Sequence, residues 1–300
     1  MRTTFRLWLR LNRVTLAITV LVMAIASLFG VLYASTVACD PSLGPADCAR
    51  FLNANLPSTA FTAVLALLPI ALGIILGVAA IGREIDDHTA AFPWSMTTSR
   101  RRWLTERVAI DALAVALIGL LSGIVNAVLV AKLNPGHDLA ASFVGYGLWG
   151  PILIARGLCA YAVGLVLGAT LGRVMPAMTI AMLVAASVTI AALVVGRSFE
   201  PATLVPGRDP SLSDAMIVQV GGLTPDGRFV PMIDCPKYIP APPSGLSSDQ
   251  LDAWYSCPAA ASYLLGHQMP GVEFREGAML LLVAVGFGAL AYAAVGRRTP

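Results

Sequence analysis

The chain has 300 residues, of which 57% are hydrophobic and only 12% are charged. Soluble domains carry about twice that share of charged residues, so the composition excludes an ordinary water-soluble protein and indicates a chain embedded in a membrane. The formal net charge of +3 is small, and no basic patch is interleaved with stacking aromatic residues, which argues against a nucleic-acid partner.

Six apolar runs are long enough to cross a membrane as helices. A transmembrane helix needs about 20 predominantly apolar residues. The predicted fold class is therefore an all-α polytopic membrane protein with six transmembrane helices. In chain order, the runs are 14–33, 59–81, 108–131, 151–171, 178–195 and 278–295.

The Lys and Arg residues between these runs predict the orientation. With both termini in the cytosol, twelve of the 20 Lys and Arg residues lie on the cytosolic side. Seven lie outside, but five of those fall in one long loop, where the positive-inside rule hardly applies. The first run is longer than the core of a signal peptide, which favours a retained helix over a cleaved one. We therefore expect a multi-pass protein with both termini cytosolic.

Four of the five cysteines fall on the predicted outer side, and none falls in a cytosolic loop. Disulfides persist in oxidising compartments, so we expect these four to pair. Three pairings are possible, and we favour Cys39 with Cys48 and Cys235 with Cys257 because each pair closes a short local loop. Four unpaired structural cysteines are the alternative.

Residues 82–107 form a short, charge-dense segment that leads into the third helix. Ser99 can cap that helix by accepting a hydrogen bond from a first-turn N–H group, and residues 134–136 (Asn-Pro-Gly) end it. Such a helix is roughly 50 Å long, against about 30 Å of hydrocarbon. Its first turns, with Arg100–Arg102 and Arg107, therefore project into the cytosol.

The largest water-facing stretch is predicted to be a small outer domain over residues 197–277. It holds 11 of the 20 prolines, which argues against a further span. Residues 216–220 and 228–233 are predicted strands joined through a Thr-Pro-Asp-Gly turn. The expected domains are 1–196 with the first five helices, 197–277 with a disulfide-bonded outer domain, and 278–300 with the last helix and a cytosolic tail.

Glycines recur one helical turn apart in three of the runs. Such spacing lets helix backbones approach each other closely, although it does not name the partner helix. The sets are Gly73 and Gly77, Gly119 and Gly123, and Gly164, Gly168 and Gly172.

Polar residues inside the runs are candidates for function. An ionisable residue within a span usually faces a cavity or a partner, so Asn126 and Arg156 are candidate residues on a substrate path. The alternative for Arg156 is that its side chain extends to the outer headgroups. Asp111 is expected to form an i,i+4 ion pair with Arg107.

The sequence holds no set of residues for catalysis, metal binding or nucleotide binding. A phosphate-binding loop needs a lysine after glycine, and the only two lysines, Lys132 and Lys237, do not follow one. Residues 86–88 (Asp-Asp-His) are adjacent and cannot all face one ion. No Gly-x-Ser-x-Gly or His-Glu-x-x-His pattern is present. We expect no enzyme, no metal and no bound cofactor, so any ATP must be bound by another polypeptide.

The charged segment suits mechanical coupling to such a polypeptide. An ATPase that closes on ATP needs a rigid cytosolic element to push, and a short charged segment fused to a long helix provides one. The alternative is a solvated basic loop held at the headgroups.

The same segment carries a family resemblance. Arg83 and Glu84, then Thr89, then Trp94 and Ser95, then a Thr/Ser link into the run 100–104 (Arg-Arg-Arg-Trp-Leu) resemble the stretch between the second and third spans of actinobacterial ATP-binding-cassette (ABC) permeases of the type-two exporter class. Residues 147–177 resemble the fourth span of that family through Gly150, Pro151, the glycines up to Gly172, and the pair Pro176 and Ala177. His88 stands where the family usually has glycine.

This resemblance implies the permease subunit of an ATP-driven exporter of an amphipathic compound such as a drug, an antibiotic or a lipid. It implies a bacterial plasma membrane, a cytosolic ABC ATPase that binds ATP and Mg²⁺, a second permease copy or close relative, and lipid contacts. The residues expected to couple to the ATPase are Arg83, Glu84, Trp94, Ser95, Arg100, Arg101, Arg102 and Trp103. The rival hypothesis is a membrane-embedded sensor or scaffold that signals through its outer domain.

Overall fold

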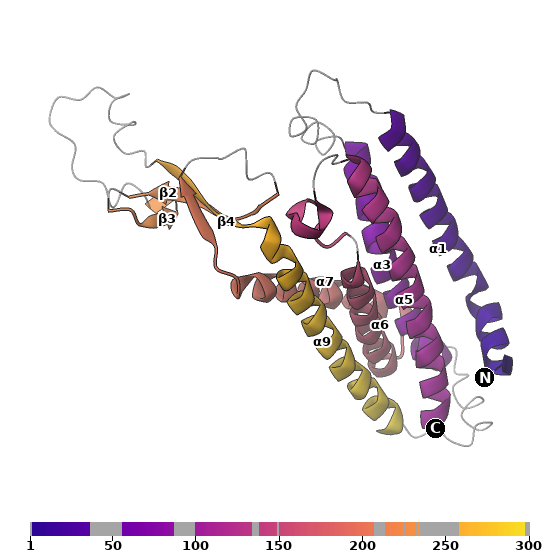
Figure 1. Ribbon diagram of the computed structural model, residues 1–300. Helices are drawn as coiled ribbons and strands as arrows, with labels where there is room; N and C mark the ends of the chain where they lie inside the picture. Colours follow the sequence, from indigo (N-terminus) through magenta and orange to yellow (C-terminus); the bar gives the residue numbers. More distant parts are fainter. Residues whose placement is uncertain are drawn as a thin grey trace. The chain divides into compact units, whose positions relative to one another are not determined.

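Long helices dominate the computed structural model (Figure 1). It describes residues 2–36, 56–86, 100–133, 138–148, 150–206, 214–224, 226–231, 233–234 and 258–297. Within these ranges, 6 helices are long and apolar enough to cross a membrane, which confirms the six predicted spans. They are α1 (Arg2–Thr36), α3 (Leu56–Asp86), α5 (Arg100–Leu133), α6 (Pro151–Leu171), α7 (Val174–Ser198) and α9 (Met269–Arg297). Cys39, Cys48, Cys235 and Cys257 lie outside the described residues, so their pairing stays a prediction.

The chain divides into two compact units. The helical unit consists of residues 1–136, 145–197 and 272–300, and the sheet unit of residues 137–144 and 198–271. The first residues of α1 and the last residues of α9 lie at the same end of the helical unit (Figure 1). We call this end, at which α1 begins, the inner end.

Helix α6 is the centre of the helical unit and packs against α3 and α5. A Cβ atom added to Gly168 would come within 2.6 Å of the Val78 carbonyl oxygen on α3, and Gly73 and Gly77 face the backbone of α6 just as closely. The glycine spacing predicted close packing without naming a partner, and the partners are α3 and α6. Any larger side chain at these positions would push the two backbones apart.

Helix α5 extends well beyond α6 at the end opposite the inner end, which we call the outer end. Its 34 residues give a length of about 51 Å, in agreement with the length expected from sequence. Gly119 lies against Ile154, in the first turn of α6. The fourteen residues that follow Gly119, up to Leu133, therefore carry α5 about 21 Å past that level. In Figure 1 the upper end of α5 lies above the upper end of α6.

Helix α9 begins earlier than predicted. The apolar run alone indicated a helix over 278–295, whereas α9 begins at Met269 and includes Glu273, Arg275 and Glu276. The apolar run does not extend back to the start of the helix because three charged residues interrupt the apolar pattern. Two of them, Glu273 and Glu276, have polar partners in the fold that allow the helix to continue through them.

The sheet unit holds four antiparallel strands in the order β1-β4-β2-β3. Their bounds are β1 (Thr203–Pro206), β2 (Met216–Leu223), β3 (Phe229–Pro231) and β4 (Ala259–Leu264). The predicted hairpin is confirmed as β2 and β3. Its turn places Gly227 at a φ of 74°, where glycine is favoured, and the Gly227 N–H donates to the Thr224 carbonyl at 2.8 Å. Strands β1 and β4 were not predicted.

Short 3₁₀ helices complete the described connections. In the sheet unit, η1 (Leu139–Ala141) and η5 (Gly266–Gln268) are single turns, and η2 (Phe143–Gly145) leads into the helical unit. The Phe143 N–H donates to the Asp214 carbonyl at 2.9 Å, which ties this connection to the residues before β2.

Candidate functional site

A buried carboxylate joins three helices near the inner end. The Asp111 side chain on α5 is 1% exposed. Its Oδ1 accepts a hydrogen bond from the Trp8 indole N–H of α1 at 2.5 Å, and its Oδ2 accepts one from the Tyr161 hydroxyl of α6 at 3.3 Å. The Arg107 Nε lies 3.6 Å from Oδ2. We call Trp8, Arg107, Asp111 and Tyr161 the inner polar cluster.

The inner polar cluster is costly to disturb. A buried charge that loses a partner retains its full desolvation penalty, because neither lipid nor apolar side chains can replace the hydrogen bond. The predicted pair of Arg107 with Asp111 is confirmed. The contacts of Asp111 with Trp8 and Tyr161 were missed because those residues are 103 and 50 positions away in sequence.

The first turns of α5 carry several of the residues expected to couple to an ATPase. Arg102 has an exposed side chain that forms an i,i+4 ion pair with Glu106 at 3.5 Å. Two residues later, Leu104 is 1% exposed and belongs to a core cluster with Ile81 of α3 and Val295 of α9. Leu104 therefore fixes α5 to its neighbours one turn before the inner polar cluster.

The other predicted coupling residues fall into two groups. Arg83 is exposed in the last turn of α3, and Glu84 beside it is half-buried. The backbone is helical from Arg100 to Trp103, and of that stretch only the Arg102 side chain is described. Trp94 and Ser95 lie outside the described residues.

Two further hydrogen bonds join the inner ends of the helices. The Tyr292 hydroxyl of α9 donates to the Thr105 hydroxyl of α5 at 3.1 Å. The Val174 N–H at the start of α7 donates to the Asp86 carboxylate at the end of α3 at 3.2 Å. Together with the inner polar cluster, these bonds link α5 to α1, α6 and α9, and α3 to α7. A displacement of the inner ends of α3 and α5 can therefore reach every other span.

A second polar cluster lies where α6 and α9 begin. The Arg156 guanidinium donates to the Glu276 Oε1 through Nε at 2.9 Å and Nη2 at 2.7 Å, and to the Gly147 carbonyl at 2.8 Å. The Tyr146 hydroxyl donates to the other oxygen of Glu276. The Gly147 N–H donates to Glu273 at 3.0 Å. We call these five residues the outer polar cluster.

The outer polar cluster is closed to solvent at its centre. Glu276 is fully buried and the Arg156 side chain is 14% exposed. Burial, followed by the hydrogen bond to Glu276, raises the pKa of Tyr146 far above its ordinary value, so this hydroxyl stays protonated and keeps donating. The Arg156 guanidinium is held by Glu276 and the Gly147 carbonyl, whereas its depth relative to the outer headgroups stays a prediction.

Asn126, the second candidate on a substrate path, is fully buried between α5 and α3. Its Nδ2 donates to the Thr62 carbonyl at 3.3 Å, and within the described residues its Oδ1 has no hydrogen-bond partner. The structure thus gives Asn126 and Arg156 different partners, on different helices. Among the described residues, no three His, Cys, Asp or Glu side chains come together as metal ligands.

Comparison with known proteins places these features in a family. Residues 11–197 match the family described as ABC-2 membrane transporter related. The chain belongs to this family. The match covers more than half of the sequence and ends at residue 197, just before the larger segment of the sheet unit, residues 198–271. No curated protein and no solved structure matches the chain.

The family match confirms the resemblance to type-two ABC permeases. ABC-2 permeases are membrane transport subunits, are not themselves catalytic, and generally work with a separate ATP-binding subunit. The matched residues include Arg107, Asp111 and Tyr161 of the inner polar cluster, and Arg156 of the outer one. Trp8, Glu273 and Glu276 lie outside the match.

Proposed function

We propose that this ABC-2 permease is the transmembrane subunit of an ATP-driven exporter, and that residues 83–104 receive the movement of a cytosolic ABC ATPase. The observation that carries the proposal is the set of contacts at the inner ends of the helices. The cytosolic start of α5 leads, through buried Leu104, directly to Asp111, where α1, α5 and α6 are joined.

The proposed transmission uses α5 as a rigid lever. A push on the turn that carries Arg102 moves the whole helix, because an α-helix resists compression along its hydrogen-bonded axis. The bond from Tyr292 to Thr105 passes the movement to α9, and the inner polar cluster passes it to α1 and α6. The hydrogen bond between Asp86 and Val174 passes a movement of α3 to α7.

The proposed partners are inferred from the missing phosphate-binding loop and from the six spans. ATP and Mg²⁺ are bound by the ATPase, because neither lysine of this chain follows a glycine as a phosphate-binding loop requires. Six helices form half of a translocation pathway, so two copies, or this chain and a close relative, pair. The proposed cargo is an amphipathic compound, the proposed location is a bacterial plasma membrane, and both termini are cytosolic.

The first test reverses charge at the start of α5. We expect a chain with Arg100, Arg101 and Arg102 all changed to Glu to insert and fold, but to lose both transport and the ATPase that co-purifies with wild type. Mild-detergent purification from the native host, with mass spectrometry of the accompanying proteins, measures the second effect. Arg228→Glu, at the exposed turn of the sheet unit, is the matched control and leaves both unchanged.

Two outcomes would reject the proposal. Wild-type transport by the triple variant would exclude a coupling role for these arginines. A stable wild-type preparation without any nucleotide-binding partner, together with activity that survives an ATPase unable to hydrolyse ATP, would favour the membrane-embedded sensor or scaffold. The ordered four-stranded sheet is the feature that keeps this rival in consideration.

A further inference from the structure

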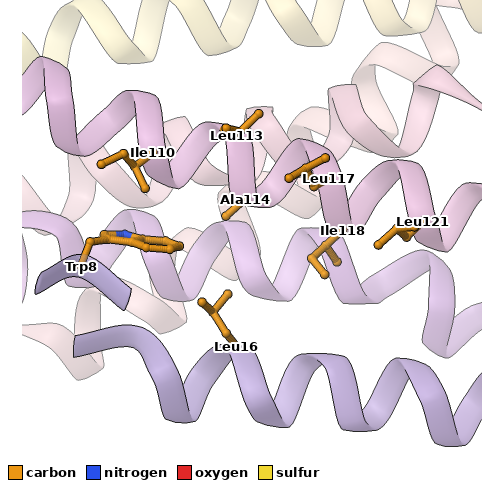
Figure 2. A pocket seen from close by; sticks show the side chains of 8 residues that line it. All are labelled: Trp8, Leu16, Ile110, Leu113, Ala114, Leu117, Ile118 and Leu121. Carbon is orange, nitrogen blue, oxygen red and sulfur yellow. The ribbon is translucent and has the colours of Figure 1, made fainter. Parts of the chain in front are cut away.

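An apolar groove lies between α1 and α5 in the helical unit. Its volume is about 330 Å³, roughly twice that of a cavity that holds benzene and at the lower end of ligand pockets. Figure 2 shows Trp8 and Ile110 at one end of the groove and Leu121 at the other. All eight lining side chains are hydrophobic.

The groove is shaped for an extended chain. Its α5 wall is one stripe of residues three or four positions apart, from Ile110 through Ala114 and Leu117 to Leu121. The eleven steps from Ile110 to Leu121, at about 1.5 Å each, give that wall a length of about 16 Å. Leu117 is 51% exposed, so the wall is open along one side and can be entered from the lipid.

The chemistry of the lining excludes a polar ligand. Among the eight described lining residues, only Trp8 has a side-chain N–H, and it is already donated to Asp111. A ligand with hydrogen-bonding groups would lose its water contacts here without gaining replacements. A hydrocarbon chain has no hydrogen bonds with water to lose, and it would make the dispersion contacts that an unfilled groove lacks.

Positive charge flanks the groove near its Trp8 end. Arg10 and Arg13 of α1 are exposed and lie between Trp8 and Leu16 in sequence. Arg13 precedes Leu16 by three residues, which places both on neighbouring positions of one helix side. Long arginine side chains can extend from an apolar surface towards lipid headgroups. Arg10 is three residues before Arg13, so a phosphate beside Arg13 is within reach of both long side chains.

We propose that this groove holds one acyl chain of an anionic phospholipid, taken from the leaflet that the N-terminus faces. The acyl chain lies along the stripe from Ile110 to Leu121, and the headgroup phosphate is bound by Arg10 and Arg13. The lipid fills the space between α1 and α5 next to Trp8, and so keeps the indole against Asp111. It is a structural ligand of the inner polar cluster.

Photolabelling tests the proposal on the full chain in vesicles of unlabelled phosphatidylcholine. The probe is phosphatidylglycerol with a photoreactive diazirine in one acyl chain, compared with phosphatidylcholine that carries the same chain. We expect peptides covering 8–16 and 110–121 to be labelled several-fold more by the anionic probe, and excess unlabelled phosphatidylglycerol to compete. The measurement needs neither ATPase nor transport, so its result is independent of the proposed function.

Variants separate the two parts of the site. Ala114→Phe fills the groove and should reduce its labelling by both probes, whereas Ala289→Phe, on an exposed face of α9, should leave it unchanged. The double change Arg10→Gln and Arg13→Gln should keep the labelling but remove the preference for the anionic probe. It leaves the groove itself intact, so it tests the site even if Ala114→Phe does not fold.

Three results would overturn the proposal. The first is equal labelling by both probes. The second is labelling that spreads evenly over the groove and the exposed face of α9 without competition, which describes bulk lipid. The third is an unlabelled groove in a chain that cross-links to a second copy through residues 110–121, because the groove would then be a protein interface.

Discussion

The pair of Arg156 and Glu276 gives the sharpest quantitative prediction. Arg156→Met leaves the buried Glu276 carboxylate with the Tyr146 hydroxyl and without its two guanidinium hydrogen bonds. Removal of one partner from a buried ion pair typically costs about 3–5 kcal/mol of unfolding free energy. Glu276→Met should cost a similar amount, since it leaves the arginine unpaired.

The double variant is expected to recover most of that loss. With Arg156→Met and Glu276→Met together, neither member of the pair is left behind without the other, and replacement of a buried ion pair by apolar groups is often close to neutral. The unfolding free energies of wild type, both single variants and the double variant, measured by titration with a denaturing detergent, form a double-mutant cycle. A coupling energy of about 3 kcal/mol or more is expected.

The same four proteins decide whether Arg156 lines a substrate path. A coupling energy below about 1 kcal/mol would refute the argument, because the pair would then be solvated in the membrane-embedded protein. If the double variant is stable and transports normally, Arg156 serves to fix α9 against α6. A stable double variant that no longer transports would instead place the guanidinium on the path of the cargo.

Three further predictions concern single contacts. Trp8→Phe removes the hydrogen bond to Asp111 at a cost of about 1.5–3 kcal/mol of unfolding free energy. We expect ATP hydrolysis in the assembled complex to continue while transport falls. An unchanged amount of transport per ATP hydrolysed would exclude a role for this bond. Gly168→Ala places a methyl group 2.6 Å from the Val78 carbonyl oxygen and should lower the free energy of unfolding by about 1–3 kcal/mol. The control Gly286→Ala, with no atom within 4 Å of the added methyl group, should be neutral or stabilising. Equal effects of the two variants in a melting experiment would contradict the packing of α3 against α6. If Cys235 and Cys257 pair, their joint change to Ala lowers stability by about 2–5 kcal/mol, and the two peptides stay linked in wild type under non-reducing mass spectrometry; free thiols at both positions would refute the pairing.

Local patterns were enough to predict the spans and the ends of α5. A long apolar run has few alternatives to a membrane helix, and the sequence Asn-Pro-Gly after Leu133 contains a proline, which has no N–H group for a continuing helix, followed by glycine, which is typical of helix ends. The ion pair of Arg107 with Asp111 was predictable for the same reason, because its partners lie one turn apart.

Long-range partners could not be predicted from one sequence. Glu276 lies 120 positions after Arg156. Nothing in the local sequence of Glu276 distinguishes the buried partner of an arginine from a loop residue. Strand β4 was missed because its residues, Ala259–Leu264, include three alanines, which have weak β propensity. It is a strand because it is hydrogen-bonded on both sides, to β1 and β2. The ion pair and this strand are therefore properties of the tertiary fold.

The distance in sequence between Arg156 and Glu276 also has a consequence for biosynthesis. Protein synthesis adds about 5–20 residues per second, so the 120 residues between the two take on the order of 6–24 s to make. During that interval α6 must enter the membrane with an arginine whose carboxylate partner does not yet exist. A charge at a helix centre costs about 2.5–3.5 kcal/mol to insert, and Arg156, near the start of α6, costs less than that. Until α9 is made, the Arg156 guanidinium has only the Gly147 carbonyl of its two partners, so the stability of α6 in the membrane depends on a helix that is synthesised later.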